Sequence, residues 1–211
     1  MPRWLWITIA VGILALFWAA GRDPAVAPAV GPGGALACPQ MASPAGLAEP
    51  LQVRVDDAPV VTIEGHTMRP LAAFALEARV LGREDYTFDR NARLSPTDLA
   101  LGWQRMADPA VYKRLDISQG GRWYRYRWGA EGPPLPQREI VRSSANMHLV
   151  PANEAVADAI DRVKEDQTVR LQGWLVEIRS EDGWLWRSSL SREDSGDGAC
   201  ELIYVCELES F

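Results

Sequence analysis

The residues that could carry out chemistry are one histidine and a few carboxylates in polar stretches of a 211-residue chain. A histidine and carboxylates can act as general acid and base in hydrolysis, and the candidates for this role are His148, Asp98, Asp194 and Glu201. Ser143 and Ser144 precede the histidine, but the Gly-x-Ser-x-Gly elbow that exposes a serine nucleophile is missing. Because apolar residues flank His148, we favour a structural histidine held by hydrogen bonds.

A loop rich in carboxylates, residues 192–201, could hold a metal ion. Ca²⁺ prefers six or more oxygen ligands, and the candidate ligands here are Glu193, Asp194, Asp197 and Glu201. Their spacing differs from that of an EF-hand, so we favour a solvated hairpin loop in which Arg192 pairs with a neighbouring carboxylate. The sequence therefore predicts no cofactor, with Ca²⁺ as the alternative.

Four polar side chains are further candidates for holding a ligand: Asn146, Ser188, Ser189 and Arg192. The run Arg122–Trp128 alternates arginines with aromatic residues, as strands on which nucleic-acid bases stack often do. However, the formal net charge is −6, and an acidic domain lacks the positive surface that attracts nucleic acid. We therefore expect a packed surface strand, no nucleic acid, and a small ligand or an envelope protein as partner.

The last forty-odd residues, Thr168–Leu208, would do most to position these side chains, because they predict three consecutive strands in a meander. Their apolar alternation changes phase at Gly173, as at a β-bulge, and such bends curl a sheet toward a barrel. Ser180–Gly183 has the composition of a hairpin turn. One face of the final strand would pack into the core with Leu202, Tyr204, Cys206 and Leu208.

Earlier segments predict more strands and short helices. Leu71–Leu81 fits both a strand and a helical stripe, and we favour the strand because Gly82 ends it. Ser95–Asp98 has the N-cap, proline and acidic residue of a helix start, Asp108-Pro109 repeats this signal, and Asn153 predicts the cap of a further helix. The expected fold is α+β: a curled, mostly antiparallel sheet resembling an OB-like small barrel, with two or three short helices.

The N-terminal residues 1–21 predict a transmembrane anchor. Trp4–Ala20 is an uncharged run about long enough to cross a bilayer as a helix, and Arg3 favours an N-terminus inside the cell. A cleaved signal peptide is the alternative, although bulky Phe17 and Trp18 disfavour cleavage there. Residues 22–50, rich in Pro, Ala and Gly, predict a linker, and residues 51–211 an exported domain. We expect a single-pass inner-membrane protein whose C-terminal domain lies outside the cytoplasm.

The three cysteines show no recognisable disulfide framework. Cys200 and Cys206 would be too far apart along a regular strand to pair. We expect Cys206 to be a buried, unreactive thiol, and Cys38 to lie in a mobile linker, where it could pair with Cys200 or with another molecule.

Several blocks resemble a family of uncharacterised bacterial membrane-associated proteins. The blocks are Ser95–Trp103, Ser143–His148, Trp186–Asp194 and Gly198–Glu201. The resemblance would span about Phe74–Glu207, with Gln104 and Ser191 as mild departures. It implies membrane association, one shared domain and a common site for the polar blocks, but no reaction. We therefore expect a binding or accessory module of the bacterial envelope; the alternative is a hydrolase that uses His148 with nearby carboxylates, with or without a metal.

Overall fold

The computed structural model describes residues 28–31, 34–42, 44, 46–193 and 200–211. The expected anchor and two of the candidate metal ligands, Asp194 and Asp197, lie outside these ranges. Within the described ranges, no helix combines the length and the apolar character that crossing a membrane requires.

The domain is built mostly from strands. These are β1 (Leu51–Arg54), β2 (Val61–Ile63), β3 (His66–Asp85), β4 (Thr97–Gly102), β5 (Leu115–Gly120), β6 (Trp123–Trp128), β7 (Ser144–Pro151), β8 (Thr168–Arg179), β9 (Leu185–Arg187) and β10 (Glu201–Ser210). The helices are short: the 3-10 helix η3 (Gln104–Ala107), α2 (Pro109–Tyr112), α3 (Gln137–Ser143) and α4 (Glu154–Asp161). The predicted caps of α2 and α4 are confirmed, since the Asp108 and Asn153 side chains accept hydrogen bonds from the backbone of their first turns.

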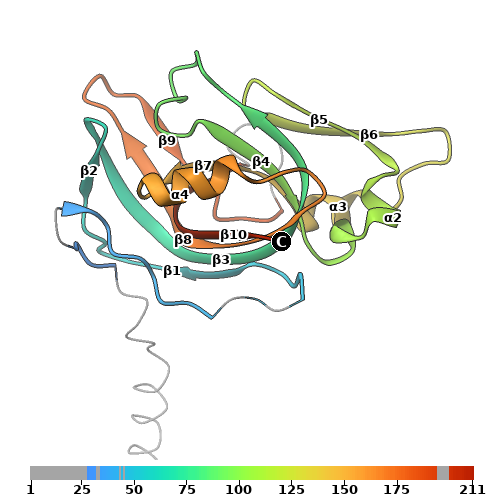
Figure 1. The fold of residues 1–211 in the computed structure, drawn as a ribbon, viewed down its shortest axis with the longest axis horizontal. Coiled ribbons are helices and arrows are strands. Elements are labelled where there is room, and N and C mark those ends of the chain that lie inside the picture. The colour runs from blue at the N-terminus through green and yellow to red at the C-terminus, as the bar shows by residue number, and fades with distance from the viewer. Residues whose placement is uncertain (1–27, 32–33, 43, 45, 194–199) are drawn as a thin grey trace, which may run out of the picture.

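The longest strand, β3, organises the sheet (Figure 1). It pairs with β8 along one edge and with β2, β1 and β4 along the other, so most of its 20 residues are buried. The strand expected over Leu71–Leu81 is confirmed as its middle. Irregularities of register between Pro70 and Ala72, and between Val80 and Gly82, allow so long a strand to curl.

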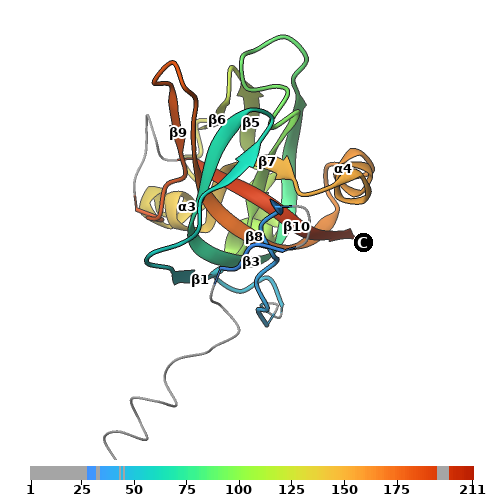
Figure 2. The ribbon, with the colours of Figure 1, turned by 90° about the vertical axis from the view of Figure 1, so that its left-hand side faces the viewer.

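The main sheet follows the order β1-β3-β4-β7-β10-β8-β9, and the additional pairing of β3 with β8 makes it a partial ring. Its pairs are antiparallel except β7 and β10, which are parallel. β5 and β6 form a separate ribbon (Figure 2). The predicted class is therefore confirmed: an α+β fold with a largely antiparallel sheet and short helices.

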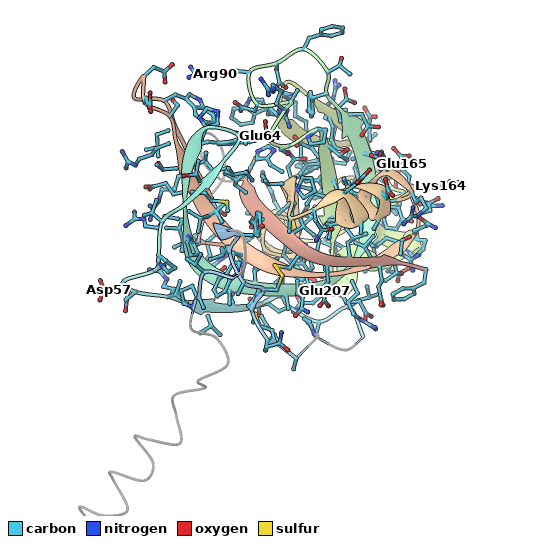
Figure 3. All side chains as sticks on the ribbon, turned by 60° about the vertical axis from the view of Figure 1, so that its left-hand side comes forward. Asp57, Glu64, Arg90, Lys164, Glu165 and Glu207 are labelled. Carbon is cyan, nitrogen blue, oxygen red and sulfur yellow. A yellow bond between two sulfur atoms is a disulfide. The ribbon has the colours of Figure 1, made fainter. Side chains whose placement is uncertain are left out.

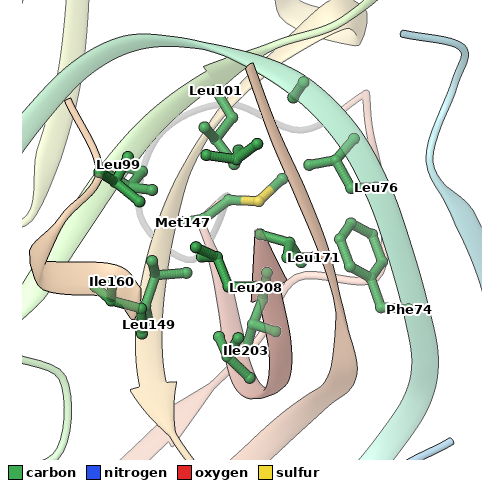
Figure 4. Close-up of a cluster of buried hydrophobic side chains, with 14 of the residues drawn as sticks. Phe74, Leu76, Leu99, Leu101, Met147, Leu149, Ile160, Leu171, Ile203 and Leu208 are labelled. Carbon is green, nitrogen blue, oxygen red and sulfur yellow. The ribbon is translucent and has the colours of Figure 1, made fainter. Parts of the chain in front are cut away.

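The ring encloses the main core. Its side chains are large and apolar, and they include Phe74, Leu76, Leu99, Leu101, Met147, Leu149, Leu171 and Ile203 (Figure 4). The helix α4 contributes Val156 and Ile160 to the same core. A second cluster lies on the other face of the sheet and contains Met68, Val150, Trp174, Ile178, Leu202 and Tyr204. Strands with two buried faces explain why the apolar alternation of the sequence is interrupted so often.

The prediction that a helix starts at Ser95–Asp98 is wrong, because this segment leads into strand β4. Thr97–Gly102 is completely buried between β3 and β7, so backbone pairing on both edges outweighs the local capping signal. The Ser95 hydroxyl donates to the Thr97 carbonyl instead of capping a helix.

The predicted meander is also wrong in its order. Among the described residues β9 pairs with β8 alone, whereas β10 inserts between β8 and β7. Opposite Gly173, the register of β10 shifts between Val205 and Glu207, so the bulge predicted at the glycine lies on the partner strand, at Cys206. Beyond this bulge Leu208 joins the core inside the ring, whereas Tyr204 and Cys206 belong to the outer cluster.

The bulge places Cys206 where it forms a disulfide with Cys38, with the two Cα atoms 5.6 Å apart. The expectation of a buried free Cys206 and a mobile Cys38 is therefore wrong. Part of the expected linker packs on the sheet: Leu36 is buried in the outer cluster, and the Trp174 Nε1–H donates to the Ala37 carbonyl over 2.8 Å. These contacts hold the Cys38 segment against β10 although its Ala- and Gly-rich sequence offers few core residues.

Candidate functional site

The candidate site lies on the outer face of β4 and β7. These strands are antiparallel, with Asp98 opposite His148 and Ala100 opposite Asn146. Because side chains alternate along a strand, Met147 packs into the core while Asn146 and His148 face outward. Pairing in register therefore brings three sequence-predicted candidates, Asp98, Asn146 and His148, onto one buried polar face.

A fourth residue, Arg122, completes this site. Its Nη1–H donates to Asp98 Oδ1 over 2.8 Å, and Asn146 Nδ2–H donates to Asp98 Oδ2 over 3.2 Å. The Asp98 side chain is fully buried, and that of Arg122 is 13% exposed. A buried carboxylate is tolerated only when it is paired and hydrogen-bonded, and Arg122 and Asn146 meet this requirement.

The geometry of the β5–β6 turn brings Arg122 to this position. Gly121 and Arg122 form the two-residue loop between the strands, and both have positive φ values, 58° and 69°. Two successive residues of this kind are typical of a type I′ hairpin turn. A positive φ is uncommon for arginine, so the contacts of its side chain must stabilise this conformation.

Those contacts are numerous. Arg122 donates through Nε and Nη2 to both carboxylate oxygens of Asp89, over 2.8 and 2.9 Å, and through Nη1 to the Ser95 carbonyl. Its guanidinium also stacks 3.7 Å from the ring centre of Tyr86. Burial alone would raise the pKa of Asp89, but the hydrogen bonds and the positive charge of Arg122, together with hydrogen bonds from two backbone N–H groups, outweigh burial and hold this pKa below its usual value. Burial raises the pKa of Tyr86 to about 12, so this phenol stays neutral.

His148 lies beside Asp98 but is enclosed. Nδ1 is 2.9 Å from Asp98 Oδ2, yet the ring nitrogen is not oriented for a hydrogen bond to it. Only 4% of the His148 side chain is exposed, and its ring lies 4.9 Å from that of Trp186 in β9. The separation of His148 and Asp98 is that of a catalytic dyad, but the buried pair offers almost no surface to a substrate.

Arg192 and Glu201 form a second buried pair. Arg192 Nη1–H donates to Glu201 Oε1 over 3.2 Å, and the two side chains are 12% and 1% exposed. The Arg192 guanidinium lies 5.2 Å from the ring centre of Phe74, which belongs to the core inside the ring. The predicted pairing of Arg192 with a nearby carboxylate is seen, but inside the fold and not in a solvated loop.

The remaining candidates have structural partners. The Ser188 hydroxyl oxygen accepts a hydrogen bond from the Leu202 backbone N–H, and the Ser189 hydroxyl bonds to Ser191. Glu193 forms ion pairs with Arg138 and Arg142 of α3. The described residues contain no group of three metal-ligating side chains, while the Ca²⁺ hypothesis also involves Asp194 and Asp197, which lie outside them.

The polar blocks of the sequence thus converge in part. Asp98, Asn146 and His148 come together, Trp186 covers His148, and the Cys200 thiol lies 3.8 Å from the Arg122 carbonyl. The sequence pattern does not identify Arg122 as a member of this site, because it places this residue in an aromatic surface strand. The Gly120-Gly121-Arg122 sequence is a signal for a tight hairpin, and it could have separated Arg122 from that strand.

Comparisons with models of known protein families, with curated proteins and with solved structures find no match to this chain.

Proposed function

We propose that the chain is a membrane-anchored binding or accessory module of the bacterial envelope, with its domain outside the cytoplasm. The observation that carries this proposal is the Asp98–Arg122 pair, since the residues best suited to catalysis bind one another beneath a covering ribbon. The resemblance of the polar blocks to bacterial membrane-associated proteins agrees with this assignment.

The topology supports an OB-type barrel as the scaffold. The ring strands follow the order β3, β4, β7, β10, β8 and back to β3, with one parallel pair. Barrels of this type usually bind ligands on the face of their second and third strands, here β4 and β7. In this chain the Arg122 turn occupies that face, so a ligand of this module would bind elsewhere on the domain.

Burial of His148 favours binding over hydrolysis. A general base must reach the proton that it removes, either directly or through one water molecule. The His148 ring is covered by Trp186, and the Asp98 carboxylate that would assist it already neutralises Arg122. The hydrolase alternative would require the ribbon and β9 to move away together.

Two features support export. The run Trp4–Ala20 has the composition of an anchor, and the Cys38–Cys206 disulfide fits an oxidising compartment. Fusion of alkaline phosphatase after Phe211 should give active enzyme, while a fluorescent protein that matures only in the cytoplasm should stay dark. The opposite pattern would contradict the orientation, and a soluble processed product would contradict the anchor.

Binding and hydrolysis can be separated with His148→Gln. A photoreactive residue placed at exposed Phe88, Trp128 or Leu185 should give discrete envelope adducts in living cells. These adducts should persist in His148→Gln as long as the variant is folded. Turnover by the purified full chain on ester, amide or phosphoester substrates, lost in folded His148→Gln, would support the hydrolase instead.

A further inference from the structure

One buried glutamate holds three arginines on the surface formed by β3, β8 and β9. Arg69 of β3 and Arg187 of β9 are the cross-strand neighbours of Glu177 in β8, and Arg179 follows two residues later on the same face. Glu177 Oε1 accepts from Arg179 Nε over 2.9 Å and from Arg69 Nη2 over 3.2 Å, and Oε2 accepts from Arg187. Strand pairing therefore fixes the guanidinium groups around one carboxylate.

The arginines remain available to solvent. The side chain of Glu177 is only 5% exposed, whereas those of Arg69, Arg179 and Arg187 are 48, 57 and 46% exposed. Each guanidinium has five N–H donors, and the bonds to Glu177 use only a part of them. The unused donors can reach a ligand from outside.

The charges around Glu177 do not balance. One carboxylate faces three guanidinium groups, which leaves two positive charges, and no other carboxylate among the described residues has more than two basic partners. Neighbouring like charges on a sheet are destabilising. A chain with formal net charge −6 nevertheless concentrates positive charge here. An anion would relieve the repulsion.

A groove of about 460 Å³ runs beside two of these arginines. Its lining includes Arg69 and Arg187, Arg54 at the end of β1, and Asp56 and Asp57 in the loop that follows β1. Asp57 projects outward to solvent (Figure 3), and both aspartates are exposed. Because the arginines are exposed as well, water screens the repulsion and the attraction alike, and binding of an anion depends on the short charge-assisted contacts that Arg69 and Arg187 can make.

We propose that this groove binds a phosphate monoester group, held by Arg69 and Arg187. Guanidinium forks match the oxygens of phosphate, and a monoester carries about −1.5 to −2 charges near neutral pH, close to the excess at Glu177. A carboxylate ligand carries a single negative charge, so it would neutralise only one of the two excess positive charges at Glu177. This assignment rests on the proposed role as a binding module and specifies its ligand.

The probe is inorganic phosphate added to the purified full chain in detergent, with chloride at matched ionic strength as the reference. Phosphate should raise the melting temperature in a saturable way, because a ligand that binds only the native state stabilises it. Arg69→Gln/Arg187→Gln should weaken phosphate binding at least about tenfold, since it removes two charge-assisted contacts. Arg187→Gln alone, on the short strand β9, leaves Glu177 two partners and should weaken binding by a smaller factor.

Arg93→Gln is the matched control. It also removes one positive charge, but Arg93 pairs with Glu64 away from the groove, and its side chain is 85% exposed. It should bind phosphate as the parent does. Equal responses of the parent, the control and the folded double variant would overturn the site.

The source of the phosphate is tested with two soluble esters. Glycerol phosphate, a monoester, should bind with an affinity similar to that of inorganic phosphate. Glycerophosphoglycerol, the diester headgroup of an anionic lipid, carries one charge and should bind more weakly. Preference for the diester would overturn the monoester assignment. A negative result for phosphate would leave the binding-module proposal intact, because that proposal is tested separately by envelope adducts and by turnover.

Discussion

Arg122 Nη1 lies 2.8 Å from Asp98 Oδ1, so the tip of the β5–β6 ribbon is tied to the buried face of β4. The same guanidinium binds both oxygens of Asp89 in the β3–β4 connection. One arginine therefore joins the ribbon, the ring and a connecting loop. Asp89 and Asp98 thus share one cation.

Arg122→Met should destabilise the fold by about 3–5 kcal/mol, because it leaves the Asp98 carboxylate buried without its cation. Asp98→Asn in the same chain should recover part of this loss by removing the uncompensated charge. Urea unfolding followed by tryptophan fluorescence measures both effects.

The control for this pair is Arg127→Met. Arg127 lies 3.8 Å from Asp116, and both side chains are more than 70% exposed, so the change should cost at most about 1 kcal/mol. Similar losses of unfolding free energy for Arg122→Met and Arg127→Met would show that the buried Arg122–Asp98 pair does not hold the β5–β6 ribbon on the sheet.

Asp89 should contribute to acid unfolding. Its folded pKa lies below the usual value, which is about 3.9 in unfolded chains. The stability that it contributes is thus fully present above about pH 4 and is lost as the pH falls through the lower folded value. Asp89→Asn should lose stability less steeply below pH 4 than the parent, in urea titrations at a series of pH values. An unchanged slope would contradict this role.

The strands and helix caps could be predicted because local patterns and final structure agree there. β3, α2 and α4 carry apolar periodicity or capping residues that tertiary contacts reinforce. β4 could not be predicted in this way, because its capping signal is local whereas its pairing partners, β3 and β7, come from distant parts of the chain.

The candidate site was only partly predictable for a similar reason. Asp98, Asn146 and His148 were candidates by residue type, but their shared face depends on the register of β4 against β7. Arg122 joins them through a turn with two positive φ values. Likewise, the pairing of Cys38 with Cys206 requires a bulge that shifts the phase of β10. Spacing along the sequence cannot specify contacts that arise from register.

The Cys38–Cys206 bond should be recovered by non-reducing peptide mapping of the exported protein. Replacing both cysteines with serine should lower the free energy of unfolding by about 2–5 kcal/mol, because the bond closes a long loop in the unfolded chain. Cys200→Ser is the control and should leave the bond and the effect of reductant unchanged. A native Cys200–Cys206 bond would instead show that the chain does not form a continuous strand over Glu201–Ser210.

Gly173→Ala should destabilise the domain severely, because the glycine lies against the bulged strand. A Cβ at this position would be 2.0 Å from the Tyr204 carbonyl oxygen, which belongs to backbone and cannot turn aside. The strands would have to separate at the bulge that carries Cys206, so we expect a loss of at least about 3 kcal/mol or failure to fold.

Gly129→Ala is the matched control for this last prediction. Apart from its own chain neighbours, no atom in the described part of the chain lies within 4 Å of a Cβ built there, so alanine should be tolerated. Thermal unfolding of the two variants compares the positions directly, and non-reducing mapping of any folded Gly173→Ala protein reports whether Cys38 still reaches Cys206. A Gly173→Ala domain as stable as Gly129→Ala, with the disulfide intact, would show that β8 and β10 do not approach as closely as this bulge requires.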